Sequence, residues 1–186
     1  MKEEVHKCVK VLEEGGLILY PTDTVWGIGC DATNEDAVRK VFKLKQREDS
    51  KSLIIIVAND RMLNYHVKDI SELAWDIIDI AEKPTTIIYE NATNLAPNLI
   101  AKDNSVAIRM IKEGFAHQLA FNYRKPIVST SANISGSPTP FSFDEIPNQI
   151  KDNVDYIVNS KFDSGSKKPS SLIKLRTNGD IEILRK

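Results

Sequence analysis

A short run of aliphatic residues, Leu53 to Val57, most narrows the folds that this chain can adopt. The run holds one leucine, three isoleucines and one valine, with no polar residue between them. A strand with one face in water alternates apolar and polar residues, whereas a strand covered on both faces is apolar throughout. We therefore expect residues 53–57 to form a central strand of a sheet that is covered on both faces.

Helical and strand patterns alternate along the rest of the chain. Apolar residues at helical spacing predict helices over 3–14, over 71–80, 114–123 and 141–150, and from a cap at Thr33 or Asn34 to about Leu44. Further strands are expected at 17–20, 85–89, 106–110, 126–130, 156–158, 171–175 and 181–184. Because the last strands have no helices between them, the pattern predicts an α/β fold with a twisted, mainly mixed β-sheet and flanking helices. The polar segment 159–168 is the expected mobile loop.

Length and charge limit the partners of such a fold. The 186 residues, 41% of them hydrophobic, suffice for one buried core, so we expect a single domain over residues 1–186. A net charge of -1 gives no overall attraction to nucleic acid or to an anionic membrane. The chain shows no signal peptide and no apolar stretch of membrane-spanning length, which predicts a cytoplasmic protein with no membrane partner. Cys8, Cys30 and three scattered histidines lack the spacing of a metal site or a disulfide framework.

Positive charge is concentrated in one segment, between Arg39 and Lys51, which holds six basic and two acidic residues. Lys45 and Arg47 can be interpreted in two ways. In the first, they lie in the last turn of a helix, where positive charges complement the helix dipole. The other reading is that both side chains hold one polyanion. Positions two apart face the same side only in an extended chain, so this second reading requires the helix to end near Leu44, before Lys45.

Two polar loops follow predicted strands. The segment 20–24 follows the first strand, and the hydroxyl-rich segment 129–133 follows the apolar residues 126–128. Such segments also form plain turns, but binding sites of open α/β sheets lie beyond the carboxyl ends of strands, so we expect both loops to meet in one crevice. Gly27, Gly29 and Ala32 match a dinucleotide fingerprint, but the strand does not run directly into a helix there, which argues against that site, and no Walker A motif is present.

Four segments together resemble the YrdC family of threonylcarbamoyl-AMP synthases in order and spacing. They are Tyr20-Pro21-Thr22-Asp23-Thr24-Val25-Trp26-Gly27, Lys45-x-Arg47 with Lys51, Val106-Ala107-Ile108-Arg109, and Ser129-Thr130-Ser131-Ala132-Asn133-x-Ser135-Gly136. The resemblance runs from about Val9 to about Leu175 and is to the short, single-domain bacterial form. It implies a YrdC-like open concave groove over the sheet. It also implies a reaction that joins L-threonine, bicarbonate and ATP into threonylcarbamoyl-AMP and pyrophosphate, for threonylcarbamoyladenosine modification of tRNA.

The resemblance also implies roles for individual residues. Lys45 and Arg47 are the expected catalytic residues, and the nucleotide is held by Lys45, Arg47, Lys51, Ser105, Ser131 and Asn133. The threonine is held by Thr24, Arg109, Ser129 and Ser170, with Arg109 on its carboxylate. The reaction needs positioning and charge neutralisation more than proton transfer, so no His/Cys/Asp catalytic set is expected. Mg²⁺ is expected on the ATP phosphates rather than on protein ligands, and tRNA and the threonylcarbamoyl-transferase complex are the implied downstream partners.

Two other functions remain open from the sequence. The chain could be a non-catalytic RNA-binding module that uses the groove and the basic segment 39–51, or a paralogue of the same fold with a different acceptor. The Lys-x-Arg and Ser-x-Asn pairs are both present, which favours the synthase. Lys45 and Arg47 are expected to be exposed, so alanine at either position should remove turnover and leave the fold intact.

Overall fold

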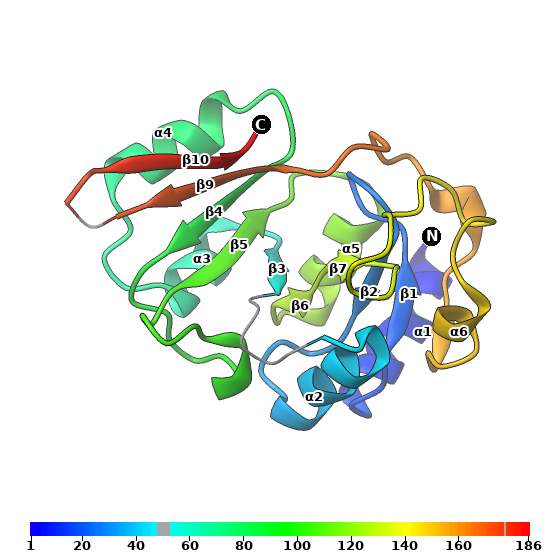
Figure 1. Cartoon of the computed structure of the whole chain (residues 1–186). Helices are drawn as coiled ribbons and strands as arrows, with labels where there is room; N and C mark the ends of the chain where they lie inside the picture. Colours follow the sequence, from blue (N-terminus) through cyan, green and yellow to red (C-terminus); the bar gives the residue numbers. More distant parts are fainter. Residues whose placement is uncertain (48–52, 177) are drawn as a thin grey trace.

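The computed structural model describes residues 1–47, 53–176 and 178–186, and its strands form two mixed sheets (Figure 1). The smaller sheet has the order β7-β2-β1-β8 and the larger the order β10-β9-β4-β5-β3-β6. The smaller contains β1 (Ile18–Tyr20), β2 (Gly27–Gly29), β7 (Thr130–Ser131) and β8 (Tyr156–Ile157). The larger contains β3 (Ile54–Val57), β4 (Thr85–Tyr89), β5 (Val106–Met110), β6 (Ile127–Val128), β9 (Ser171–Leu175) and β10 (Ile181–Arg185).

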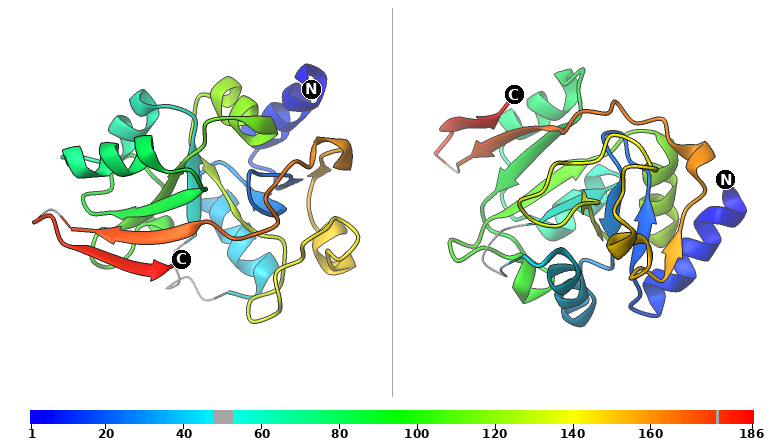
Figure 2. Two further views of the ribbon diagram at one scale, coloured as in Figure 1. Left: turned by 90° about the horizontal axis from the view of Figure 1, so that it is seen from above. Right: turned by 45° about the vertical axis from the view of Figure 1, so that its right-hand side comes forward.

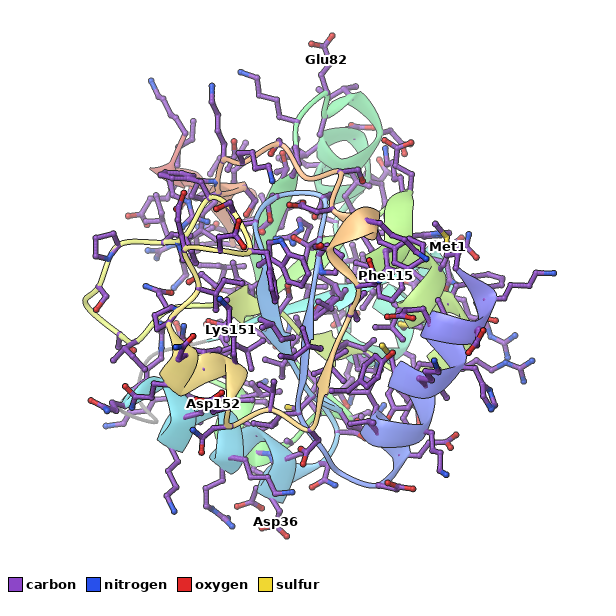
Figure 3. The ribbon with its side chains drawn as sticks, turned by 90° about the vertical axis from the view of Figure 1, so that its right-hand side faces the viewer. Met1, Asp36, Glu82, Phe115, Lys151 and Asp152 are labelled. Atoms are coloured by element: carbon purple, nitrogen blue, oxygen red, sulfur yellow. The ribbon has the colours of Figure 1, made fainter. Side chains whose placement is uncertain are left out.

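Helices cover one face of the larger sheet. The helices are α1 (Lys2–Glu13), α2 (Glu35–Lys45), α3 (Asp60–His66), α4 (Glu72–Ile80), α5 (Gly114–Tyr123) and α6 (Asn148–Lys151), with 3₁₀ turns η1 (Pro97–Leu99) and η2 (Ser160–Phe162). Figure 2 shows α3, α4 and α5 on one side of the larger sheet, and β9 and β10 at its far edge, away from these helices. Figure 3 shows the smaller sheet between α1, near Met1, and α6, which carries Lys151. No helix within the described part of the chain is long and apolar enough to cross a membrane.

The central strand is where the aliphatic run predicted it. β3 pairs with β5 in parallel and with β6 in antiparallel orientation, and Ile55, Ile56 and Val57 are fully buried. The α/β class, the mixed pairing and the flanking helices are confirmed. The helices and strands expected at 3–14, 71–80, 85–89, 106–110, 114–123 and 171–175 are present within one residue at each end.

The expected strand at 126–130 is two strands in different sheets. β6 belongs to the larger sheet and β7 to the smaller, and Ser129 lies between them. The Ser129 amide donates to the Ile54 carbonyl oxygen at 2.7 Å, while the next residues pair with β2. The chain therefore crosses between the sheets at Ser129. The prediction of a single strand was wrong because the two halves of this segment pair with strands of different sheets.

The prediction of a helix over 141–150 was also wrong, since the only helix in this range is the short α6, which begins at Asn148. The Glu145 carboxylate accepts hydrogen bonds from the Phe141 amide at 2.8 Å and from the Ser142 hydroxyl at 3.2 Å, which fixes a turn. Pro147 then disfavours helical backbone at the residue before it. The sequence patterns also missed β2, whose two glycines carry no side-chain pattern, and the short helix α3.

Helix α2 begins at an Asn34 cap, one of the two caps that the sequence predicted. The Asn34 side-chain oxygen accepts from the Asp36 amide at 3.0 Å and from the Ala37 amide at 3.1 Å. Asn34→Ala should lower the free energy of unfolding by about 1 kcal/mol, because two helix-terminal amides lose their acceptor. Urea denaturation tests this, with the exposed Asn122→Ala on α5 as the control that should change it by less than about 0.5 kcal/mol. Equal values for the two variants would contradict the cap.

Candidate functional site

A cleft of about 250 Å³ lies where the two sheets meet. Its floor is apolar and comes from neighbouring strands of the larger sheet, since Ala107 pairs with both Ile54 and Ile88. Its polar lining comes mainly from the two strand-end loops and from three arginines. The lining residues are Thr22, Thr24, Val25, Trp26, Gly27, Arg47, Leu53, Ile54, Ile88, Ala107, Arg109, Ser129, Thr130, Ser131, Thr139, Pro169, Ser170, Leu172 and Arg185.

The two polar loops meet, as the strand-end argument predicted. The Ala132 amide donates to the Trp26 carbonyl oxygen at 3.0 Å, and Gly27 pairs with Ser131. Six of the residues predicted to bind substrates line this one cleft; they are Thr24, Arg47, Arg109, Ser129, Ser131 and Ser170. Among the residues that the structure describes, the lining contains three arginines and no carboxylate, so this part of the cleft has the charge of an anion-binding site.

Lys45 lies behind the cleft lining and is buried, with only 1% of its surface exposed. Its ammonium donates to the Ser131 carbonyl oxygen, to the Asn133 carbonyl oxygen at 2.6 Å and to the Asn133 side-chain oxygen at 3.3 Å. The expectation that Lys45 is exposed was therefore wrong. The Lys45 side chain connects the end of α2 to β7 and the loop after it, which is a structural role that a solvent-exposed lysine would not have.

Helix α2 ends at Lys45, one residue later than the shared-ligand reading required. The next residue, Gln46, has left-handed backbone with φ of 50°, and the Arg47 amide donates back to Phe42 at 3.0 Å. This turn at the helix end, rather than an extended chain from Leu44, allows Lys45 to lie behind the cleft while Arg47 lines it. The helix-end reading of Lys45 is therefore confirmed, the condition for the shared-ligand reading is not met, and of the two side chains only Arg47 lines the cleft.

The environment of Lys45 disfavours its positive charge. Burial, and then the nearby Arg47, lower the pKa of Lys45 to about 7, and burial also lowers the pKa of Arg47. A polyanion in the cleft would stabilise both charges. Asn133 supports the arrangement, because its side-chain oxygen accepts from the Ser131 hydroxyl at 2.6 Å and its amide group donates to the Ser137 carbonyl oxygen at 2.6 Å.

Arg109 is a buried cation in the cleft wall. Its guanidinium lies 3.1 Å from the Asp23 carboxylate, measured from Nη2 to Oδ1. Its Nε has no hydrogen-bond partner within the described residues, although the atom is buried. A buried donor without a partner costs free energy, so this guanidinium is suited to receive a further acceptor such as a ligand carboxylate.

Two residues of this region were not assigned a role from the sequence. Arg185 of β10 donates from Nε to the Ser170 carbonyl oxygen at 2.8 Å and from Nη2 to the Ser170 hydroxyl at 3.3 Å, and burial followed by Arg109 lowers its pKa. It lies beyond the motifs, and a register shift in the pairing of β10 with β9 sets its position, so no sequence signal marked it. Asp23 lies inside a quoted motif, and an acidic residue within a loop that was predicted to border the crevice was the available signal.

Three predicted nucleotide ligands do not line the cleft. Ser105 directly precedes β5, the strand that carries Ala107 and Arg109, and its hydroxyl donates to the Asp103 carboxylate at 2.6 Å. This bond and Lys174 lower the pKa of Asp103 to about 2. Lys45 and Asn133 lie behind the lining, as described above. Lys51 falls outside the described residues.

The segment 159–168, expected to be a mobile loop, is bonded to the first polar loop. The amides of Ser166 and Lys167 donate to the carbonyl oxygens of Asp23 and Thr24 at 3.0 and 2.9 Å. The Trp26 indole donates to the Asp163 carboxylate at 3.1 Å. In this structure the segment is therefore held against the wall that carries Asp23 and Thr24.

A two-sheet α/β fold, with an arginine-lined cleft and hydroxyl loops from both sheets, defines a protein that binds anionic substrates. The family model Sua5/YciO/YrdC, described as telomere recombination, matches residues 10–186. The chain belongs to this family, which confirms the resemblance that the four motifs predicted.

Curated relatives and solved structures agree with this assignment. A threonylcarbamoyl-AMP synthase of Photobacterium profundum is 34% identical over 84% of this chain and 86% of its own length. A putative threonylcarbamoyl-AMP synthase of Methanocaldococcus jannaschii is 35% identical over 98% and 87%. P. abyssi Sua5 complexed with L-threonine matches with a TM-score of 0.82 and 28% identity, over 92% of this chain and 50% of that one. This chain thus spans about half the length of that protein.

Proposed function

We propose that this chain is an L-threonylcarbamoyladenylate synthase, a nucleotidyltransferase that forms threonylcarbamoyl-AMP and pyrophosphate from L-threonine, bicarbonate and ATP. The observation that carries the proposal is the cleft itself: Arg47 and the buried Arg109 line one space of about 250 Å³, and none of its described lining residues is a carboxylate. Relatives that bear this name, and the threonine complex of P. abyssi Sua5, support the choice of substrates.

The chemistry suits a site without a nucleophilic side chain. The threonine amine adds to bicarbonate with loss of water, which gives an N-carboxylate. A carboxylate oxygen then attacks the α-phosphorus of ATP, and the bond to pyrophosphate breaks. Charge accumulates on the phosphate oxygens, so Arg47, Arg185 and the nearby Lys45 act by neutralising it, and the apolar floor limits water.

The metal enters this scheme as part of the substrate. Mg²⁺ arrives as MgATP and neutralises phosphate charge. In the described ranges, no group of three His, Cys, Asp or Glu side chains is placed to hold a metal ion. Asp23, the carboxylate beside the cleft, is already paired with Arg109. These residues fit a metal held by phosphate oxygens rather than by a protein cage.

Arg109 is assigned to the threonine carboxylate, with Thr24, Ser129 and Ser170 around the rest of the amino acid. Arg109→Lys should raise the KM for threonine about tenfold or more and leave the KM for ATP nearly unchanged, because a lysine cannot give the paired bonds of a guanidinium. Steady-state kinetics with each substrate varied in turn checks this. Arg176→Lys, on the exposed hairpin between β9 and β10, is the matched control. A raised KM for ATP alone would contradict the assignment.

Lys45 should take up a proton when ATP binds. At pH 8 its pKa of about 7 leaves it mostly neutral, and a bound triphosphate raises that pKa. We expect up to about one proton taken up per ATP, since the terminal phosphate of ATP is already ionised at this pH. Calorimetric titrations at pH 8 in buffers of different ionisation enthalpy measure this number. Adenosine, which lacks phosphates, is the control; no uptake with ATP would contradict the prediction.

The proposed activity is tested by mixing the protein with MgATP, threonine and labelled bicarbonate. Threonine-dependent release of pyrophosphate and a labelled adenylate are expected. Release with serine or another amino acid in place of threonine would indicate a paralogue with a different acceptor. Absence of any labelled adenylate would overturn the proposal. Transfer of the product to tRNA by a threonylcarbamoyl-transferase complex follows from this activity and remains a prediction.

A further inference from the structure

A second hollow, of about 1080 Å³, lies over α3 and the C-terminal end of α5; we call it the rear hollow. No residue that the structure describes lines both the rear hollow and the cleft. Figure 2 shows α3 and α5 away from β9 and β10, the edge strands of the larger sheet. Ser170, which precedes β9, and Arg185 of β10 line the cleft. A ligand of the rear hollow would therefore not compete directly with substrates in the cleft.

Two large aromatic side chains line the rear hollow and are exposed to solvent. Tyr65 is 63% exposed and Phe121 is 55% exposed. Each is held by a histidine: Tyr65 packs edge-on against His66 with ring centroids 5.1 Å apart, and Phe121 stacks with His117 at 6.0 Å. A single exposed aromatic needs no explanation, but two supported rings at one hollow form a stacking surface.

The charge of the rear hollow is one-sided. Its lining, as far as the chain is described, includes Arg61, Arg124 and Lys125 and no carboxylate. Lys125 is paired with the buried Asp31 at 2.8 Å, whereas Arg61 and Arg124 are exposed and form no ion pair with any residue that the structure describes. In a chain whose net charge is -1, two uncompensated guanidinium groups beside two open aromatic rings are a local feature.

We infer that the rear hollow binds unpaired nucleotides of an RNA, with bases stacked on Tyr65 and Phe121 and phosphates on Arg61 and Arg124. Aromatic faces bind bases of any sequence, and arginines supply the backbone contacts, which is the combination that single-stranded nucleic acid requires. The volume is at the upper end for small-molecule sites, which favours several linked nucleotides over one free nucleotide. This inference is independent of the proposed enzymatic activity.

The test is fluorescence anisotropy with a labelled oligoadenylate of about 12 nucleotides, a length that spans typical single-strand sites. The double variant Tyr65→Ala with Phe121→Ala should weaken binding about tenfold or more, because each lost stack is worth roughly 1–3 kcal/mol. Arg61→Ala with Arg124→Ala should weaken binding and reduce the slope of log affinity against log salt by one to two units. Excess MgATP should not displace the RNA.

Matched controls are available on other surfaces. Phe141→Ala removes an aromatic ring that is also 55% exposed, and Arg176→Ala removes an exposed guanidinium from the β9–β10 hairpin. Both should bind RNA as the unmodified protein does. Unchanged affinity in the rear-hollow variants, displacement by ATP, equal binding of a duplex, or equal affinity for AMP would each overturn the inference. All four altered side chains are exposed, and circular dichroism verifies that the variants fold.

Discussion

Arg47→Ala is expected to lower kcat/KM for threonine-dependent pyrophosphate release by roughly 100- to 1000-fold. This is the usual effect of removing one charged group that stabilises transition-state charge in a preorganised site. The Arg47 guanidinium lines the cleft from the turn that follows α2, and it is partly exposed. A steady-state assay of pyrophosphate release measures this loss. Urea denaturation should show a much smaller change in the free energy of unfolding than for Lys45→Ala.

Arg39→Ala is the control for Arg47→Ala. Arg39 belongs to the same basic segment but lies on the exposed face of α2, where it pairs with Glu35 at 2.8 Å and with Asp36 at 2.6 Å. Exposed pairs of this kind contribute at most about 1 kcal/mol to stability, and activity should be unchanged. Equal activity of the Arg47 and Arg39 variants would show that the cleft is not the reaction site.

Lys45→Ala should reduce both activity and stability. The Asn133 carbonyl oxygen would lose the Lys45 donor, and an unsatisfied buried acceptor costs about 1–3 kcal/mol. The Ser131 carbonyl oxygen and the Asn133 side-chain oxygen also lose a bond to Lys45, but they keep the Asn133 amide and the Ser131 hydroxyl as donors. We expect the free energy of unfolding to fall by about 2–3 kcal/mol, since the lost hydrogen bonds and the cavity left by the buried side chain both destabilise the fold. Urea denaturation measures the change.

A second substitution separates the effect of the lost hydrogen bonds from the effect of the lost side-chain volume at position 45. Lys45→Met fills nearly the same space without a donor, so it should remain destabilised if the lost hydrogen bonds dominate. An unfolding free energy of Lys45→Ala equal to that of the unmodified protein would contradict the buried network. The expectation drawn from sequence, that alanine here leaves the fold intact, was wrong because it took Lys45 for a surface cation.

Local patterns predicted the elements whose causes are local. The aliphatic residues of β3 require burial on both faces, and the spacing of Phe115, Ala116, Leu119 and Ala120 gives α5 its buried side. The cap at Asn34 acts within three residues. The position of polar loops after strands was sufficient to predict that residues 20–24 and 129–133 meet, because strand ends are shared by neighbouring strands.

Features set by distant contacts were not predictable in this way. The burial of Lys45 depends on carbonyl groups 86 and 88 residues away along the chain. The break between β6 and β7 depends on which sheet each half joins, and Arg185 reaches the cleft wall through a register shift near the end of the last strand. None of these contacts leaves a periodic pattern in the sequence. The sequence therefore indicated the cleft but not the hydrogen bonds of Lys45 behind its lining.

A structure of the protein with ATP and threonine bound would test the assignment of the cleft most directly. Phosphate oxygens are expected within hydrogen-bond distance of the Arg47 guanidinium and near Lys45. The threonine carboxylate is expected on Arg109, in contact with the Nε that has no hydrogen-bond partner among the described residues, with Thr24 and Ser170 beside the same molecule. Nucleotide bound outside the cleft, or threonine bound away from Arg109, would contradict this assignment.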